Sequence, residues 1–321
     1  MLRDEIITVF GGSGFIGRHV VRALAKAGYR VRVASRRPHL AQDLRVMGVV
    51  GQVQLVQANL RVGASVERAL EGASGVVNLV GILNENGRQT FSRLHAQGAK
   101  TVAEAAAAAG ITRFVQMSAI GANENSASRY ARTKAEGEAS VMAAVPTATI
   151  LRPSIVFGTE DGFFNRFASM ARFAPALPLF GGGKTKFQPV FAGDVAKAVL
   201  AALEAPEAQG ETYELGGPGV YSFEALMRFI LEEIDRPRFL LPLPWQIGSV
   251  IAMVSELVAI LPLIPPVLTQ DQLVQLKSDN VVAEGAKTLA DLGVQAETMD
   301  AIVPSYLGRY RRYGQFHERE A

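Results

Sequence analysis

The sequence predicts a doubly wound α/β protein, in which helices cover both faces of a parallel sheet and a smaller, mostly helical C-terminal lobe follows. Short runs rich in Val and Ile alternate with helical stretches through the first half of the chain. A glycine-rich turn directly follows the first run, and the regular alternation lapses after about residue 155. Strands that alternate with helices at this spacing require crossovers between parallel strands, with helices on both faces of the sheet.

Six strands and four helices are expected in this alternating region. The strands should cover residues 6–10, 30–35, 53–58, 75–82, 113–119 and 147–154, and the helices 17–28, 65–73, 99–110 and 131–145. Gly28, Gly72 and Gly110 stand where helices should end, because glycine readily adopts the left-handed C-cap conformation. We therefore expect residues 1–155 to form the α/β domain, with 185–205 returning to it, and residues 156–321 to form the C-terminal lobe.

The composition excludes several classes of function. A net charge of +3 over 321 residues, without a cluster of basic residues, argues against nucleic-acid binding. The chain has no cysteine, and its four histidines lack metal-ligand spacing, so no disulfide, metal site or cysteine nucleophile is expected. The first strand begins almost at the first residue, so we expect a protein that stays in the cytosol or that lost a transit peptide earlier.

The turn after the first strand carries a dinucleotide-binding signature. Gly11, Gly14 and Gly17 form G-x-x-G-x-x-G between a strand and a helix. In a Rossmann-type unit such a turn lets a pyrophosphate approach the backbone, and the following helix N-terminus offers free N–H groups and a positive dipole. The glycines therefore predict a bound dinucleotide.

The end of the second strand indicates which dinucleotide is bound. An NAD site usually places Asp or Glu there to bind the ribose hydroxyls. This chain has Ser35, Arg36 and Arg37 instead. Guanidinium groups suit a 2′-phosphate, to which they donate paired hydrogen bonds. The sequence thus favours NADP(H).

Several motifs together resemble those of the extended short-chain dehydrogenases/reductases. They are, in chain order, "GGSGFIG", "MSAIGA", "YARTK", "LRPSIVFG" and "FQPVFAGDVAKAVLAAL". With "TYELGGPGVYSFEAL" and the apolar C-terminal lobe, the chain is most similar to an atypical branch of that superfamily. This branch contains the nucleotide-binding accessory subunit of respiratory complex I and its bacterial relatives.

The resemblance implies a set of cofactor-binding positions. Ser13, Phe15 and Ile16 would line the pyrophosphate turn together with the three glycines, and Arg36 and Arg37 would meet the 2′-phosphate. The remaining positions are Asn59 and Leu60 near the adenine, Val80 and Gly81 near the ribose and phosphates, and Pro153, Ile155 and Val156 along the nicotinamide.

Tyr130 and Lys134 match the acid/base pair of the same family, and Ser118 is the candidate third partner. Four residues apart on a helix, Tyr130 and Lys134 share a face, so the ammonium can lower the pKa of the phenol. The usual position of the catalytic serine falls on Ala119 rather than Ser118, which leaves the activity in question. His95, at a position where extended enzymes often have Asn, is interpreted as a packed helix histidine.

Residues 245–268 form the most hydrophobic stretch of the chain. Its apolar side chains recur at steps of three and four residues, and about fifteen helical residues precede Pro262. A helix of that length spans roughly 22 Å, short of the roughly 30 Å hydrocarbon core of a bilayer. Two alternatives remain: burial within the lobe, or a helix lying on a bilayer or against a membrane-embedded partner. The Tyr- and Arg-rich C-terminus suits a protein interface or an anionic lipid surface.

Three functions follow from these features. The first is an NADP(H)-binding accessory subunit of complex I with a mainly structural cofactor, bound to other subunits near the membrane junction and touching lipid or quinone. Its place would be peripheral, on the cytoplasmic side of the bacterial inner membrane or on the matrix side. The second is an active NADPH-dependent oxidoreductase on an apolar substrate, in ubiquinone metabolism. The third is a sugar-nucleotide epimerase or reductase, which the apolar lobe disfavours.

Overall fold

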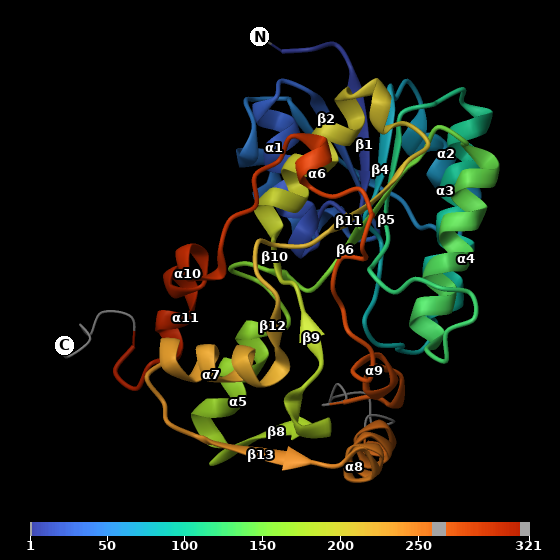
Figure 1. Ribbon diagram of the computed structural model, residues 1–321. Coiled ribbons are helices and arrows are strands. Elements are labelled where there is room, and N and C mark those ends of the chain that lie inside the picture. The colour runs from blue at the N-terminus through green and yellow to red at the C-terminus, as the bar shows by residue number, and fades with distance from the viewer. Residues whose placement is uncertain (1, 259–267, 315–321) are drawn as a thin grey trace. The chain divides into compact units, whose positions relative to one another are not determined.

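The structure, a computed structural model, describes residues 2–258 and 268–314 (Figure 1). Two compact units make up the chain. The first unit comprises residues 1–153, 192–215 and 283–295, and the second comprises residues 154–191, 216–282 and 296–321.

The first unit is built on a parallel sheet of seven strands. Along the sheet their order is β11-β6-β5-β4-β1-β2-β3, and each adjacent pair runs parallel. The strands are β1 (Ile6–Phe10), β2 (Arg30–Ser35), β3 (Val53–Gln57), β4 (Gly75–Asn78), β5 (Phe114–Met117), β6 (Thr149–Pro153) and β11 (Thr212–Leu215). The predicted doubly wound fold is confirmed, and the strand order reverses between β1 and β4.

Helices cover both faces of this sheet. On one face α1 (Phe15–Lys26) packs against α6 (Ala192–Glu204), and on the other α3 (Gln97–Ala108) packs against both α2 (Gly63–Leu70) and α4 (Arg129–Ala144) (Figure 1). The helices bury small and branched residues; α1, for example, buries Val20, Val21 and Leu24 at helical spacing. Gly28, Gly72 and Gly110 have φ angles of 90°, 67° and 69°, which is the left-handed conformation expected of them.

Two later segments complete the first unit. Strand β11 pairs with β6 and forms an edge of the sheet, and α6 leads into it through the 3-10 turn Pro206–Ala208. Residues 283–295 also belong to this unit: a bridge joins Lys287 to Tyr213 of β11, and the 3-10 turn Ala290–Leu292 packs on α6. Of the expected return, residues 185–205, only 192–205 belong to the first unit, because residues 185–191 form β9 and β10 of the second unit. The structure also adds β11 and residues 283–295 to the first unit.

In the part of the second unit that the structure describes, six helices are combined with three two-stranded sheets. Its strands pair as β7 (Val156–Phe157) with β10 (Val190–Phe191), β9 (Lys186–Phe187) with β12 (Tyr221–Ser222), and β8 (Ala176–Phe180) with β13 (Phe239–Leu243). The helices are α5 (Phe164–Phe173), α7 (Phe223–Glu233), α8 (Trp245–Val258), α9 (Gln270–Gln275), α10 (Met299–Ile302) and α11 (Pro304–Leu307). Phenylalanines fill its core, including Phe157, Phe164, Phe187 and Phe223.

Helix α8 lies within the hydrophobic stretch, and apart from Trp245, which packs against Phe180, its large side chains do not enter the core. Only Gly248 and Ala252 of this helix are buried. Val250, Met253 and Leu257 are each more than half exposed. Burial of the apolar stripe within the lobe, one of the two alternatives, is therefore wrong for residues 245–258, and residues 259–267 lie outside the described part of the chain. Across the described residues, no helix is both long enough and apolar enough to span a bilayer.

Candidate functional site

The glycine turn between β1 and α1 is packed so tightly that side chains do not fit. Gly11 has a φ of 79°, and a Cβ there would lie 3.1 Å from the backbone nitrogen of Val80. A Cβ on Gly17 would overlap the carbonyl oxygen of Gly11. The N–H of Gly14 donates to that same oxygen at 3.0 Å. The turn therefore leaves bare backbone at the carboxyl end of β1, next to the point where the strand order reverses.

The N-terminus of α1 is suited to an anion. Gly14 is its N-cap residue and supplies no side chain, and the first turn carries no acidic residue. Ser13, Phe15 and Ile16 are half-buried around the exposed Gly14. Unpaired N–H groups and the positive end of the helix dipole favour a phosphate at such a position. The predicted pyrophosphate turn fits these residues.

Arg36 and Arg37 lie at the carboxyl end of β2, and both side chains are exposed. Neither guanidinium forms an ion pair or hydrogen bond with another described residue, whereas the Ser35 hydroxyl accepts the backbone N–H of Arg37 at 3.3 Å. Two cations at this position remain available for a ligand phosphate.

The next two strands end in the same region of the first unit. After β3, the Asn59 side chain accepts the N–H of Arg61 at 3.2 Å, while Leu60 is buried in the core. After β4, Val80 is half-buried and Gly81 is exposed, and a Cβ on Gly81 would lie 3.3 Å from the Lys134 Nζ. The turn that follows β4 therefore approaches the predicted acid/base pair closely.

Tyr130 and Lys134 lie one turn apart on α4, as their spacing predicts. The Lys134 Nζ lies 5.8 Å from the centre of the Tyr130 ring and donates to the carbonyl oxygen of Met117 at 3.3 Å. The rings of Phe91 and His95 meet the Tyr130 ring edge to face. The pair is thus held at the carboxyl end of β5.

Burial lowers the pKa of Lys134 to about 8, and the charge of Glu138 opposes this shift. Glu138 lies one turn further along α4 and is itself buried. Sequence reasoning missed Glu138, although its position four residues after Lys134 is the signal that could have revealed it. Its carboxylate favours the charged form of the lysine, which would otherwise be strongly disfavoured in this environment.

His95 is a buried, neutral histidine. Burial, and secondly the charge of Lys134, lower its pKa to about 3. Its Nε2 accepts the N–H of Ile82 at 3.0 Å, and its Nδ1 lies 3.3 Å from the Thr133 hydroxyl, so we assign the proton to Nδ1. The imidazole joins the turn after β4 to α4 from within the π-helical turn Ser92–Ala96.

Ser118 has a buried hydroxyl with no hydrogen-bond partner among the described residues. Its backbone N–H donates to the carbonyl oxygen of Leu151 at 2.7 Å, which fixes the residue between β5 and β6. The carbonyl oxygen of the preceding residue, Met117, accepts the hydrogen bond of Lys134. The residue after Ser118, Ala119, is half-buried. Because an unpaired buried hydroxyl costs about 1–3 kcal/mol, this site is suited to a ligand oxygen.

The three predicted nicotinamide-contacting residues fall in different units. Pro153 ends β6 in the first unit. Ile155 and Val156 belong to the second unit, where both are half-buried and Val156 pairs with Val190.

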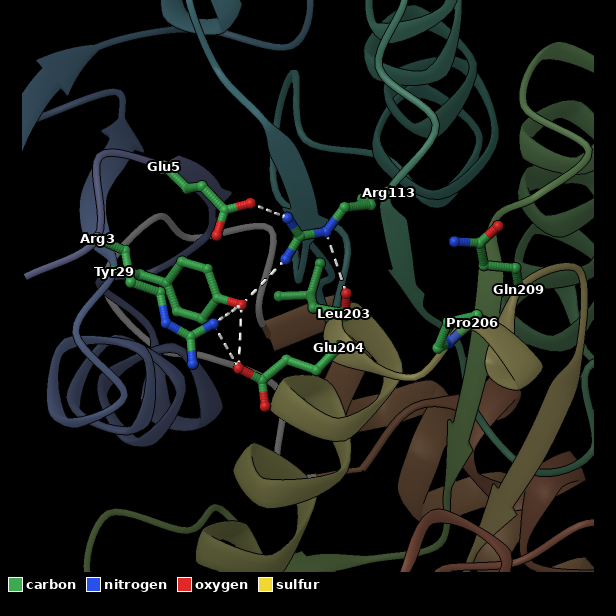
Figure 2. Close-up of a pocket in the computed structure, with 8 residues that line it drawn as sticks. All are labelled: Arg3, Glu5, Tyr29, Arg113, Leu203, Glu204, Pro206 and Gln209. Carbon is green, nitrogen blue, oxygen red and sulfur yellow. Dashed lines mark hydrogen bonds and ion pairs between the residues drawn. The ribbon is translucent and has the colours of Figure 1, made fainter.

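A separate depression of about 380 Å³ lies at the amino ends of the strands (Figure 2). Its charged groups satisfy one another: Arg113 pairs with Glu5 and Arg3 with Glu204, while the Tyr29 hydroxyl donates to Glu204 at 3.0 Å. The depression lies away from the carboxyl ends, where α/β sheets bind ligands. It is a structural network and not part of the candidate site. The described residues also contain no His, Asp and Glu cluster that could hold a metal ion.

Residues 7–216 match the model of the NAD dependent epimerase/dehydratase family, which is well over half of the chain. The chain belongs to this family. The predicted membership of the extended short-chain dehydrogenases/reductases is thereby confirmed, and the fold of this family binds a nicotinamide dinucleotide.

Among relatives, "NADH dehydrogenase (ubiquinone) 1 alpha subcomplex subunit 9, mitochondrial" of Arabidopsis thaliana is 36% identical over 96% of this chain and 79% of its own length. A ceramide reductase of Caulobacter vibrioides is 36% identical over 54% of this chain and 53% of its own. In fold, the chain is similar to the NADPH-dependent quinone oxidoreductase QOR2 of Escherichia coli, complexed with NADPH. That structure has a TM-score of 0.73 and 20% identity, with 94% of this chain and 99% of that chain covered.

Proposed function

We propose that this protein is an NADP(H)-binding accessory subunit of a complex I-type NADH:ubiquinone oxidoreductase, and that the bound nucleotide mainly stabilises the subunit. The observation that carries the proposal is the 36% identity, over 96% of the chain, to a subunit of the Arabidopsis enzyme. The other subunits of that complex near the membrane are the proposed partners. The proposed place is peripheral, on the cytoplasmic face of a bacterial inner membrane or the matrix face of a mitochondrial one.

Arg36 and Arg37 support the choice of NADP(H). Both guanidinium groups are exposed at the end of β2 and are not paired with a described carboxylate. An additional phosphate on the adenosine ribose would give them charge-assisted hydrogen bonds that NADH does not offer. Replacing both with alanine should weaken NADPH binding by at least about tenfold and change NADH binding little. Tighter binding of NADH than of NADPH by the unaltered protein would contradict the assignment.

A structural role of the nucleotide fits the chemistry of the site. Lys134 and Ser118 are buried polar groups that a bound ligand could satisfy. A ligand that binds only the folded state, at about 100 times its dissociation constant, adds about 2.7 kcal/mol of stability. The nucleotide can therefore stabilise the subunit without turning over.

The test compares two substitutions in membranes solubilised gently and separated on a native gel. Gly14→Asp places a carboxylate at the N-terminus of α1, where it repels phosphate, and Gly63→Asp makes the same change at the N-terminus of α2. We expect the protein to co-migrate with NADH dehydrogenase activity, and only Gly14→Asp to remove it from that band. Migration of the unaltered protein as a small free species would refute the proposal.

A second candidate is an active NADPH-dependent oxidoreductase on an apolar substrate, which the grouping of Tyr130 and Lys134 beside Met117 favours. The nicotinamide would supply the hydride when bound. Tyr130 would give its phenolic proton to the oxygen of a substrate carbonyl, and Lys134 would favour the phenolate that results. Loss of a quinone-linked product in Tyr130→Phe, with the complex intact, would establish this candidate.

A further inference from the structure

We propose that the second unit binds the surface of an anionic lipid bilayer through one apolar edge. This apolar edge consists of Phe239, Leu241, Val250, Met253, Val254 and Leu257, each of which is more than half exposed. The first two lie on β13 and the other four on α8, and Figure 1 shows β13 leading into α8 along one side of the unit. The inference goes beyond the proposed function and does not depend on it.

Helix α8 is oriented in the opposite way to an ordinary surface helix. Its small residues face inward: Gly248 and Ala252 are buried, and a Cβ on Gly248 would lie 3.0 Å from the side chains of Leu273 and Phe180. Its large apolar residues face outward. A surface helix of a protein that meets only water normally buries the large residues instead.

Hydrogen bonds to the segment before and within α9 fix this orientation. The Ser249 carbonyl accepts the side chain of Gln270 at 2.6 Å, and the Ser255 hydroxyl accepts the N–H of Leu268 at 3.2 Å. Glu256, the one charged residue of α8, accepts the N–H of Gln270 at 2.8 Å. Ser255 and Glu256 are therefore engaged on the protein side, and the large apolar side chains from Val250 to Leu257 remain outside.

A cluster of arginines adjoins the Phe239 end of the apolar edge. The Arg238 Nε donates to the carbonyl oxygen of Ala171, next to Arg172, and the Arg236 Nε donates to the carbonyl oxygen of Tyr310, close in sequence to Arg312, each at 2.8 Å. The charges of Arg238, Arg172 and Arg312 accordingly add to burial in lowering the pKa of Arg236. None of the four forms an ion pair with another described residue. Phe173, beside Arg172, is 82% exposed. Cations that no described carboxylate neutralises, beside exposed aromatic side chains, complement lipid phosphates and the acyl-chain boundary beneath them.

The length of α8 indicates how it would meet the bilayer. Its 14 residues span roughly 21 Å at 1.5 Å per residue, which is too short to cross the hydrocarbon core. An apolar face flanked by cations is typical of a helix that lies in the plane of the interface. The occupant of this surface is therefore the headgroup and upper acyl region of an anionic leaflet.

The test uses the purified full chain and vesicles of two compositions. One is phosphatidylcholine alone, and the other is an equal mixture of phosphatidylcholine and phosphatidylglycerol. We expect the chain to sediment with the mixed vesicles, at least about tenfold more tightly than with the neutral ones. Trp245, the single tryptophan of the chain, begins α8. It is half-buried at the start of the helix that carries four of the edge residues, so brominated acyl chains should quench its fluorescence.

Variants distinguish binding through the apolar edge from non-specific hydrophobic adsorption. Val250→Ser combined with Leu257→Ser should reduce vesicle binding at least about tenfold. Val46→Ser combined with Val50→Ser removes two apolar residues of the first unit that are even more exposed, and should leave vesicle binding unchanged. Arg172→Gln with Arg238→Gln removes two of the four cations and should weaken the preference for phosphatidylglycerol at least about tenfold.

Two outcomes would overturn the inference. One is that the chain does not sediment with the mixed vesicles. The other is that the α8 variant binds them normally but leaves the membrane fraction of cells, which would assign the surface to a membrane-embedded protein. Co-migration of the unaltered chain with NADH dehydrogenase activity is a separate measurement, so each proposal can fail while the other holds.

Discussion

Glu138 and Arg152 form a two-point ion pair, with the Arg152 Nε 2.9 Å from Oε1 and Nη2 2.6 Å from Oε2 of Glu138. Arg152 lies on β6 and also has Glu214 of β11 within 3.8 Å. Glu138 in turn acts on the buried ammonium of Lys134, one turn away on α4. Charges of alternating sign therefore extend from the candidate site to the edge strand of the sheet.

Replacement of Glu138 by Gln should destabilise the protein by about 2 kcal/mol. The substitution leaves Arg152, which is half-buried, without its two-point partner, and breaking a buried pair on one side is costly. The matched control is Glu224→Gln, which breaks the exposed pair with Arg228 on α7 and should cost less than about 0.5 kcal/mol. Urea unfolding measures both, and equal losses would show that the Arg152 pair contributes no more than a surface pair.

The buried amine of Lys134 predicts a stability change at alkaline pH. Its folded pKa of about 8 is below the value of about 10.4 for a free lysine. Between these values the unfolded state binds more protons than the folded state, so this group adds stability as pH rises. Below the folded pKa the lysine is charged in both states. Its burial then lowers the free energy of unfolding by the full amount, about 3 kcal/mol.

Lys134→Met should remove this dependence. Without nucleotide, the variant should be more stable than the unaltered protein near pH 7, and the difference should shrink by about 2 kcal/mol towards pH 9.5. Lys100→Met, at a half-exposed lysine of α3, is the control and should show no such change. A constant difference across this range would mean that Lys134 is not held in a low-dielectric site.

The buried imidazole of His95 predicts a loss of stability at acidic pH, at the opposite end of the range from Lys134. Because burial holds its pKa at about 3, only the unfolded state gains a proton as pH falls below about 6.5. Stability is therefore fully present above that value and is lost as pH falls towards the folded pKa. Between about pH 7 and pH 5 the loss should amount to about 2 kcal/mol.

His95→Gln should abolish this acid-dependent loss while keeping an acceptor for the N–H of Ile82. The exposed His39, replaced by Gln in the same way, serves as the control and should leave the pH profile unchanged. Unfolding by urea at both pH values gives the comparison. If the His95 variant loses as much stability as the unaltered protein, the acid sensitivity originates elsewhere.

The alternating region was predictable from the sequence because its signals are local. Strands such as Ile6–Phe10 are continuous apolar runs, and Gly28, Gly72 and Gly110 mark helix ends through their backbone conformation alone. The spacing of Tyr130 and Lys134 likewise fixes a shared helix face. These features need no knowledge of what packs against them.

The remaining features depend on contacts between distant segments. Strand β11 has only four residues, and its place in the sheet comes from pairing with β6. The periodicity of residues 245–258 defines an apolar stripe, but only packing of Gly248 against Phe180 and Leu273 decides that the stripe faces outward. The pairing of Glu138 with Arg152 joins α4 to β6 and has no local signature in β6.

The buried hydroxyl of Ser118 should destabilise the protein without ligand and form a hydrogen bond to a bound ligand. Ser118→Ala removes a buried donor without a described partner, so the unfolding free energy without nucleotide should rise by about 1 kcal/mol. Ser65→Ala is the control, because the buried Ser65 hydroxyl bonds the N–H of Asn59 at 2.9 Å and the carbonyl of Val62 at 2.7 Å. That substitution should instead cost about 1 kcal/mol.

The same pair of variants should diverge when ligand is added. If the Ser118 hydroxyl bonds a ligand oxygen, NADPH or a carbonyl substrate should stabilise the alanine variant less than the unaltered protein, by about 1 kcal/mol. Thermal unfolding with and without NADPH, at a fixed ratio to its dissociation constant, gives this number directly. Equal stabilisation by NADPH, together with a gain in the empty protein, would assign the hydroxyl to a substrate oxygen beyond the cofactor. A loss of stability in the empty Ser118→Ala protein would mean that the hydroxyl is already satisfied and that the site is not prepared for a ligand.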